Sequence, residues 1–327
     1  NVRVYCFLMV NVRDFGAVGD GSADDTLPIQ NAINSARANG LGPAHGNRSR
    51  ATEVWFPEGS YSISSLDCTK SVGLRLAAKV PWGVTLYADR QVISQPVIDW
   101  TGSLGCSSEG IALAATSPGG DRPAIEPTVG WLFAASLGGG DSTANYLINC
   151  GASGWFQYGG LFLFGATNMG FQYCNFEQSR GDAPAVYVGA HNPWAITSPY
   201  QSIVGGVAVT GEVSFHQCGM GNQLSGAVAT TLLLYDTYCL RFWGGVLGGS
   251  GSDHVRFWGP ENRSFIFVGT QFESEAAIPK QYGFFADGSV VNGLTLISCD
   301  FRDNGYSLGL TGGSGTFSNM NALGTVV

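Results

Sequence analysis

Charge is scarce in this 327-residue chain. Only 12% of the residues are charged, with 16 Lys and Arg against 24 Asp and Glu, and the net charge is −8. No basic stripe interrupts this acidic balance, so the sequence predicts no nucleic-acid partner. No apolar run is long enough to cross a bilayer, which predicts no membrane insertion.

Metal-binding and cofactor patterns are also lacking. The eight cysteines form neither a CxxC pair nor a Cys/His cluster at zinc spacing. We therefore expect no metal, no cofactor, and buried free thiols that act as small hydrophobic side chains. The first residues, "NVRVYCFLMVNVRDFG", have no small-residue cleavage site and predict a strand, not a signal peptide. Because the chain does not begin with Met, we expect a trimmed or processed piece.

Glycine and apolar residues are abundant instead. The chain has 48 Gly, and 44% of its residues are hydrophobic. This composition is typical of a β architecture with a large core and many tight turns. Length alone allows one large domain or two average ones.

Residues 12–36, "VRDFGAVGDGSADDTLPIQNAINSA", combine four acids with a Gly-rich stretch. No Lys stands where a phosphate-binding loop needs one, and the acids do not match the ligand spacing of a calcium loop. A structural role accounts for more of the residues in this segment than a phosphate-binding or calcium-binding role does. Asp24, Asp25 and Thr26 are predicted to accept hydrogen bonds from the first turn of a helix, where Pro28 is tolerated.

The residues after Pro28 predict the buried face of that helix. Four apolar residues follow the i, i+3, i+4, i+7 pattern, and two glycines are expected to end the helix. The apolar residues are Ile29, Ala32, Ile33 and Ala36, and the glycines are Gly40 and Gly42. The following "EVWFPEGSYSI" predicts a strand, a Pro-Glu-Gly turn and a second strand.

The segment "VRDFGAVGDGSADDTLPIQNAI" followed by "VWFPEGSYSI" resembles the N-terminal signature of the pectate-lyase-like superfamily. That group includes phage tailspikes, glycoside hydrolases and polysaccharide lyases. The resemblance implies an all-β fold, a right-handed single-stranded parallel β-helix with an N-terminal capping helix. Phrases such as "FGATNMGFQYCNFEQSRGDAPAVYVGAHN" also resemble phage tail proteins.

Internal repeats support a solenoid. Five segments align: "MGFQYCNF" (169–176), "VSFHQCGM" (213–220), "LRFWGGVL" (240–247), "FIFVGTQF" (265–272) and "LTLISCDF" (294–301). Their sixth residues are Cys174, Cys218, Gly245, Thr270 and Cys299, and a weaker copy places Cys150 before them. The first step of 44 residues is interpreted as two turns of 22. We call the sixth residue of each segment the mark. Apolar residues recur three and five positions before the mark and two positions after it. This pattern predicts stacked columns of apolar residues and a bend between two strands at the mark.

We expect three parts in the chain. Residues 1–50 would form the first strand and capping helix, residues 51–305 a parallel β-helix of roughly ten coils, and residues 306–327 a C-terminal cap or oligomer contact. Longer pieces such as "GAHNPWAITSPYQS" (189–202) would be loops on the coils.

Two copies of "RFWG" mark candidate substrate-binding residues. Because Phe242 is predicted to point inward, Arg241 and Trp243 would point outward. His216 on the preceding coil and Val268 on the following coil would stack on Trp243. Trp258 occupies the same place in the second copy. Outward aromatic rings can hold sugar rings, and burial in an oligomer interface or under a loop is the alternative.

The candidate catalytic acids are Glu273, Glu275 and Asp303, in the densest acidic group outside the N-terminal segment. Neighbouring coils can hold two carboxylates at the separation that glycosidases use. Arg302 shares the column of Glu273, so a surface ion pair is the alternative. Asp300 belongs to the same acidic group, and Glu177 occupies the position of Glu273 on another coil. Further candidates at turns are Asp182, Asp236, and Asp253 with His254.

Several catalytic patterns of the superfamily are missing. The NTD, DD and GHG segments of polygalacturonase-type enzymes do not occur in the coil region, and neither do the WxDH and RxPxxR patterns of pectate lyases. No nucleophile elbow is evident. Whether the protein is an enzyme therefore stays open, and hydrolysis is favoured over elimination if it cleaves.

The first hypothesis is a phage tailspike-like homotrimer on the virion or outside the cell. It would bind a bacterial surface polysaccharide, with cleavage left open, and would contact other virion tail proteins. The second is a non-catalytic receptor-binding or structural virion module, and the third is a secreted monomeric bacterial glycanase. Fold does not imply function, so the polysaccharide partner rests on analogy.

Overall fold

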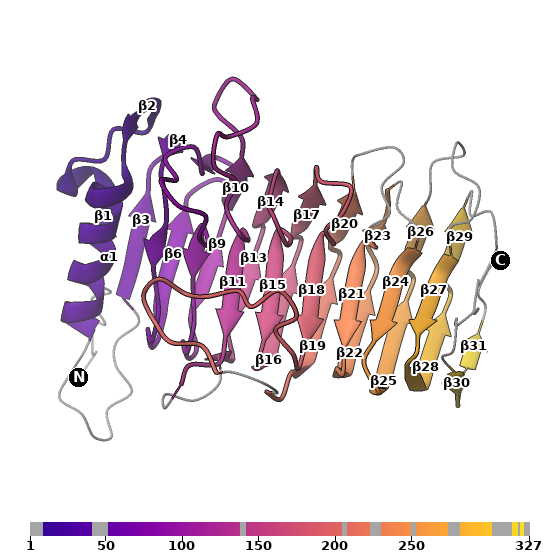
Figure 1. The fold of residues 1–327 in the computed structure, drawn as a ribbon. Coiled ribbons are helices and arrows are strands. Elements are labelled where there is room, and N and C mark those ends of the chain that lie inside the picture. Colours follow the sequence, from indigo (N-terminus) through magenta and orange to yellow (C-terminus); the bar gives the residue numbers. More distant parts are fainter. Residues whose placement is uncertain are drawn as a thin grey trace, which may run out of the picture.

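The computed structural model shows the strands wound into one long solenoid with the helix at its N-terminal end (Figure 1). It describes residues 9–40, 52–137, 142–204, 208–222, 230–249, 253–273, 282–302, 316–319 and 321–323. The strands pair in parallel into three sheets, here named A, B and C. This is the predicted right-handed parallel β-helix.

Each coil contributes one strand to each sheet in turn. Sheet A contains β1 (Met9–Asn11), β3 (Thr52–Phe56), β6 (Leu74–Ala78), β9 (Ser107–Glu109), β13 (Tyr146–Ile148), β16 (Ala166–Gln172), β19 (Gly211–His216), β22 (Tyr238–Trp243), β25 (Glu261–Val268), β28 (Val290–Ile297) and β30 (Thr316–Ser318), with β12 (Ser142–Thr143) beside β16 and β31 (Asn321–Leu323) beside β28. Sheet B contains β2 (Asp20–Asp24), β4 (Gly59–Ser62), β7 (Val84–Tyr87), β10 (Ile111–Ala115), β14 (Gly151–Gly154), β17 (Asn175–Gln178), β20 (Gly219–Asn222), β23 (Val246–Leu247), β26 (Gln271–Glu273) and β29 (Asp300–Arg302). Sheet C contains β5 (Leu66–Asp67), β8 (Ile98–Asp99), β11 (Trp131–Ala134), β15 (Leu161–Phe164), β18 (Val186–Gly189), β21 (Leu232–Tyr235), β24 (Asp253–Trp258) and β27 (Tyr282–Asp287).

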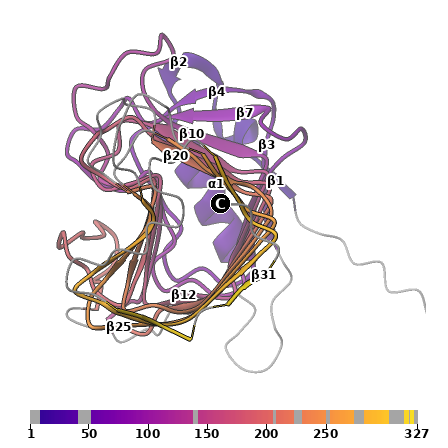
Figure 2. The ribbon, with the colours of Figure 1, turned by 90° about the vertical axis from the view of Figure 1, so that its right-hand side faces the viewer.

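The helix at the N-terminal end covers the open end of the coils (Figure 2). A short 3₁₀ helix, η1 (Val12–Phe15), precedes α1 (Thr26–Gly40), and the predicted apolar face of α1 is fully buried. Asp24 accepts from the Thr26 N–H at 3.0 Å, as predicted. The prediction for Asp25 was wrong, because its buried carboxylate accepts from Val18 N and Gly19 N. Asp25 therefore ties the preceding turn to the helix.

The predicted columns of the core are confirmed. Phe171, Phe215, Phe242 and Phe267 are register partners in consecutive strands of sheet A, and all four are buried. Their rings stack, with centroids 4.8 Å apart between Phe171 and Phe215 and 5.5 Å apart between Phe215 and Phe242. Because each ring covers the next, the interior is a continuous apolar stack.

The predicted bend between sheets A and B is also present. The residue just before the mark adopts a left-handed backbone in every aligned coil, as in Asn149 (φ 51°), Gln217 (φ 52°) and Gly244 (φ 64°). One left-handed residue turns the chain and shifts the inward positions by one. The cysteines at the mark are buried free thiols, and burial raises the pKa of Cys150 to about 12. Burial therefore disfavours the reactive thiolate form of Cys150.

One interpretation of the repeat was wrong. Phe171 pairs directly with Phe215, so the 44-residue step is a single coil and not two turns of 22. The extra length belongs to the segment after β18, which leaves the solenoid and returns before β19. Such an excursion lengthens the sequence between two strands without adding a coil to the solenoid.

Candidate functional site

The excursion, residues 190–204, lies across the outer face of sheet C (Figure 1). There it covers a second apolar cluster, separate from the core, that includes Leu132, Phe162 and Tyr187. Ile196 is buried in this cluster, and Trp194 packs against it with its ring 5.3 Å from that of Tyr187. The outer face of sheet C is therefore apolar in its middle and partly covered.

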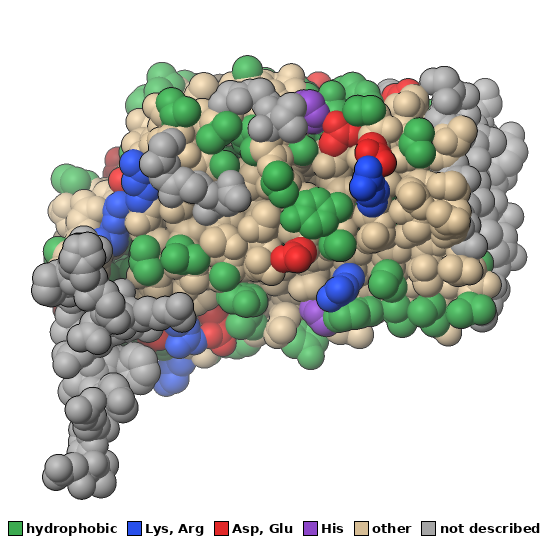
Figure 3. All heavy atoms as spheres, turned by 90° about the horizontal axis from the view of Figure 1, so that it is seen from below, with side chains coloured by type: hydrophobic (Ala, Val, Ile, Leu, Met, Phe, Trp, Pro, Cys, Tyr) green, Lys and Arg blue, Asp and Glu red, His purple; other side chains and the backbone are tan. Residues whose placement is uncertain are grey.

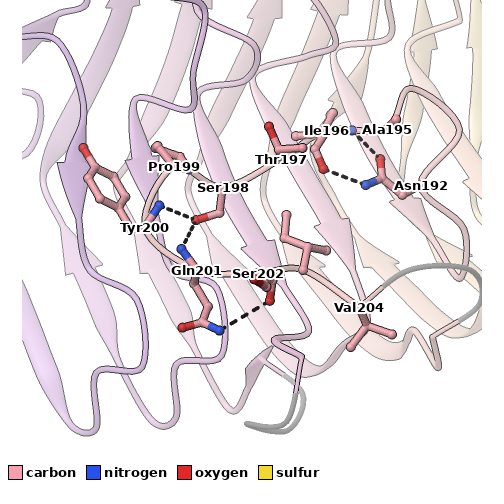
Figure 4. A pocket seen from close by; sticks show the side chains of 11 residues that line it. Asn192, Ala195, Ile196, Thr197, Ser198, Pro199, Tyr200, Gln201, Ser202 and Val204 are labelled. Atoms are coloured by element: carbon pink, nitrogen blue, oxygen red, sulfur yellow. Dashed lines mark hydrogen bonds between the residues drawn. The ribbon is translucent and has the colours of Figure 1, made fainter.

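Internal hydrogen bonds give the excursion a defined shape (Figure 4). The Asn192 side chain turns back onto Ile196, accepting from its N–H at 2.9 Å and donating to its carbonyl at 2.8 Å. Ser198 Oγ accepts from Tyr200 N at 3.1 Å. Val204 N donates to Ala135 O at 3.0 Å and fastens the end of the excursion to the solenoid. The residues of the excursion line a cavity of about 710 Å³.

A ladder of three aromatic rings runs from His191, at the start of the excursion, across the outer face of sheet C. Trp258 stacks on Tyr235 with centroids 5.4 Å apart, and Tyr235 stacks on His191 with centroids 4.3 Å apart. Trp258 is 39% exposed. His191 Nε2 lies 2.8 Å from Asp236 Oδ2, and the other Asp236 oxygen accepts from Glu261 N at 2.9 Å. Asp236 thus holds the imidazole at one end of the ladder.

A cavity of about 310 Å³ opens beside Trp258. Trp194 and Leu233 contribute apolar surface to it, and Asp182 and Arg256 contribute polar groups. An apolar pocket with a few fixed polar groups is typical of a small-molecule or sugar subsite.

Ion pairs order the polar groups of this cavity. Arg180 binds both oxygens of Asp182, at 2.8 and 2.6 Å, and its hydrogen bonds lower the pKa of that carboxyl. Arg256 Nε donates to the buried Asp253 at 2.6 Å. A ligand would therefore meet oriented, already paired charges, which favours hydroxyl groups over a full charge.

The predicted binding residues divide between two faces. His216 and Trp243 are neighbours on sheet A, with ring centroids 4.5 Å apart at 60°, and Val268 follows Trp243 as predicted. Arg241 lies exposed in the same strand. Trp258 ends β24 in sheet C, so the two "RFWG" copies do not form one surface. The letters RFW end strands of two different sheets.

The predicted catalytic acids are only partly within the described residues. Glu273 lies in β26, with Oε1 3.6 Å from Arg302 Nη1, and Arg302 Nε also binds Asp300 at 2.5 Å. This is the ion pair that the sequence suggested as the alternative role. Glu275 and Asp303 lie outside the described residues.

Sequence analysis missed Trp194, Tyr235 and His191 as site residues. The five aligned segments cover sheets A and B, while these residues belong to sheet C and the excursion. A signal was available in "LLLY" and "VRFW", two strands whose last residues are aromatic and stack in register. Aligning the third strand of each coil would have shown the ladder.

No helix in the described part of the chain is long and apolar enough to span a membrane. Within the same residues, no group of three or more His, Cys, Asp and Glu side chains could hold a metal ion.

Residues 9–71 match the family model "Rhamnogalacturonase A/epimerase, pectate lyase-like". This match covers about a fifth of the chain. In sequence, the chain is 46% identical over 54 residues to mannuronan C5-epimerase AlgE3 of Azotobacter vinelandii, and this stretch is 16% of this chain and 2% of that protein. It is 47% identical over 62 residues to plasmin and fibronectin-binding protein A of Streptococcus pneumoniae, 19% of this chain and 7% of that one. The alignments therefore span only a small part of these relatives.

Solved structures share the fold over almost the whole chain. The S. pneumoniae surface adhesin PfbA has a TM-score of 0.60 at 13% identity, with 96% of this chain and 83% of that one covered. A mutant tailspike protein of E. coli bacteriophage HK620, in complex with a pentasaccharide, has a TM-score of 0.55 at 12% identity, with coverage of 95% and 65%. At these identities the similarity shows the fold.

Proposed function

We propose that this protein binds a bacterial surface polysaccharide along the outer face of sheet C, as a phage tailspike-like protein on the virion or outside the cell. The observation that carries the proposal is the ladder Trp258–Tyr235–His191 beside the cavity of Trp194 and Arg256. Stacked, partly exposed rings offer flat apolar faces to sugar rings, and the fixed polar groups select their hydroxyls.

The surface and the comparisons support a neutral, extended ligand. Charged side chains form only small groups between hydrophobic and neutral ones on the face seen in Figure 3. Among the similar folds, a tailspike protein holds a pentasaccharide and another protein is a surface adhesin. A parallel β-helix presents its strands as a long row, which suits a polymer better than a compact ligand.

Replacing Trp258 by Ala should weaken polysaccharide binding at least about tenfold, because the ring is the exposed end of the ladder. Binding is measured by calorimetry with a panel of bacterial surface polysaccharides. Trp243→Ala, on sheet A, is the matched variant and should bind as the wild type does. The reverse result, with loss only in Trp243→Ala, would move the site to sheet A.

Cleavage is the finer part of the proposal, with Glu273, Glu275 and Asp303 as the acids. If the protein hydrolyses its polysaccharide through them, Glu273→Gln and Glu275→Gln should each lower the rate at least about a hundredfold while binding persists. Release of reducing ends measures the rate. Undiminished cleavage in both variants would exclude Glu273 and Glu275, and a full panel without cleavage favours a non-catalytic receptor-binding module.

The homotrimer is a separate part of the proposal. Light scattering should give three times the chain mass of 34.4 kDa, about 103 kDa. The exposed aromatic and aliphatic residues of sheet A, Tyr146 and Val290 among them, are where we expect chains to meet. A mass of one chain would favour the secreted monomeric glycanase.

A further inference from the structure

The excursion across sheet C covers a carboxyl group near its tip. Ile98 of β8 belongs to the core, so by alternation its neighbour Asp99 points outward, in register with Asp67 of β5. An outward side chain of a bare sheet would meet water, but Asp99 is completely buried. The Ser198 side chain of the excursion lies close enough to lower the pKa of this carboxyl. The tip of the excursion therefore forms the cover over Asp99.

Under this cover Asp99 is incompletely paired. Thr101 N donates to one carboxyl oxygen, Oδ1, at 2.9 Å. The other oxygen, Oδ2, has no hydrogen-bond partner among the residues that the structure describes. Burial without a partner disfavours a charged carboxylate more than a neutral carboxylic acid. The covered arrangement therefore favours the protonated form of Asp99.

The tip of the excursion is fastened at both ends and packs lightly in between. Ile196 is buried in the apolar cluster at one end, and Ser202 O accepts from Leu137 N at 2.8 Å at the other. None of the side chains of residues 197–201 is buried. Ser198 Oγ accepts from two amides of the same tip, at 3.1 and 2.9 Å (Figure 4). Residues 197–201 can therefore lift with little loss of apolar packing while the two ends stay in place.

The other titratable groups around Asp99 leave it as the group that responds to pH. Asp67 raises the pKa of Asp99 further, and Asp67 Oδ2 itself lies 3.3 Å from Nη1 of Arg37 of α1. Burial raises the pKa of Tyr200 of the tip above its usual value of 10.0. Burial also raises the pKa of the Cys68 thiol, well above 9.0. Tyr200 and Cys68 therefore stay neutral from acid to slightly alkaline pH.

We propose that residues 197–201 form a pH-sensitive strap, which lies closed over Asp99 while this carboxyl is protonated and lifts when it is ionised. Lifting brings the carboxylate into water. It also uncovers the outer face of sheet C at β8, in the same row of strands as β18, β21 and β24, which lead to the ladder. The use of this uncovered face by a polysaccharide rests on the proposed function, and the movement of the strap does not.

The sign and the size of the effect follow from the proton affinity of Asp99. In the closed state burial raises the pKa from 3.8 to about 6. Closure is therefore fully favoured below about pH 4 and is lost as the pH rises through about 6. A difference of about two pKa units changes the ratio of closed to open strap by up to about a hundredfold.

Hydrogen exchange of the ligand-free protein measures the opening of the strap. The exchange is followed by mass spectrometry at pH 4, 5, 6 and 7.5, and the intrinsic pH dependence of amide exchange is divided out. Protection in peptides that contain residues 197–201 should fall at least about tenfold between pH 4 and pH 7.5. Peptides of β15, which is buried in the same sheet, should keep their protection.

Two variants separate Asp99 from other carboxyl groups. Asp99→Asn keeps the shape of the side chain but cannot ionise, so protection of its strap should be the same at pH 4 and pH 7.5. Asp121→Asn removes an exposed carboxylate from the loop between β10 and β11, and its strap should behave as in the wild type. Circular dichroism verifies that both variants are folded.

Other outcomes overturn the strap. Constant protection of the wild-type strap from pH 4 to pH 7.5 does so without any variant. An equal fall in Asp99→Asn means that another group drives the opening, and a parallel fall in β15 means a general loosening of the solenoid. The proposed function fails separately, through unchanged polysaccharide binding in Trp258→Ala, because no sugar is present in the exchange experiment.

Discussion

Replacing Phe215 by Ala should lower the free energy of unfolding by about 3–5 kcal/mol. Phe215 is completely buried, and its ring lies between those of Phe171, 4.8 Å away, and Phe242, 5.5 Å away. Removing it takes the central ring out of the stack and leaves a cavity that neighbouring coils cannot close, because their strands are held in register. Urea unfolding followed by circular dichroism measures the loss.

Arg241→Ala is the matched control for this experiment. Arg241 is exposed on the adjacent strand of the same sheet, so its removal should change the unfolding free energy by no more than about 0.5 kcal/mol. A loss below about 1 kcal/mol for Phe215→Ala would contradict the continuous ring stack. Equal losses in both variants would contradict it as well.

Replacing Asp99 by Asn should stabilise the protein at neutral pH. Asp99 lies on the outer face of sheet C in register with Asp67, and it is completely buried. Burial raises the pKa of the Asp99 carboxyl from 3.8 to about 6, although Thr101 N donates to it at 2.9 Å. Asn keeps the shape and the acceptor oxygen and carries no charge.

The sign of the pH dependence follows from the raised pKa. The folded protein holds the Asp99 proton more tightly than the unfolded chain, so the stability from this proton is present below about pH 4 and is lost as the pH rises through about 6. A shift of about two pKa units corresponds to about 3 kcal/mol. Asp99→Asn should therefore exceed the wild type by up to about 3 kcal/mol at pH 7.5 and match it near pH 4.

Asp182→Asn provides a control of opposite sign. Hydrogen bonds from Arg180 lower the pKa of Asp182, so this carboxylate contributes stability above its unfolded pKa and loses it as the pH falls. Because Asp182 is largely exposed, Asp182→Asn should cost less than about 1 kcal/mol at pH 7.5. Urea unfolding at pH 4, 6 and 7.5 compares the variants. If Asp99→Asn instead lowers the free energy of unfolding at pH 7.5, the buried carboxylate of Asp99 does not destabilise the folded protein.

Much of the fold was predictable from particular residues. In a solenoid, similar residues of successive coils stack on one another. The Phe column of sheet A and the cysteines at the mark therefore repeat visibly along the sequence. The N-terminal helix was equally predictable, because its apolar spacing is local. The role of Asp25 was not, since its partners Val18 and Gly19 are chosen by how the turn folds back onto the helix.

The candidate site was less predictable. His216 and Trp243 could be paired from the repeat, because both stand at one position of aligned segments. The ladder could not be found in this way, because the excursion after β18 places His191 outside any repeat. Trp258 was identified as a candidate from the motif "RFWG". This motif does not indicate which of the three sheets contains the residue.

The sequence by itself determined the β-helix, its inward columns and its N-terminal cap, because these depend on spacing along the chain and on repetition from coil to coil. Only the tertiary structure decided which outward residues meet. Trp258, Tyr235 and His191 stack because separate parts of the chain bring them to one face. Outward positions are not constrained by the core, so their pattern carries no repeat from which contacts could be predicted.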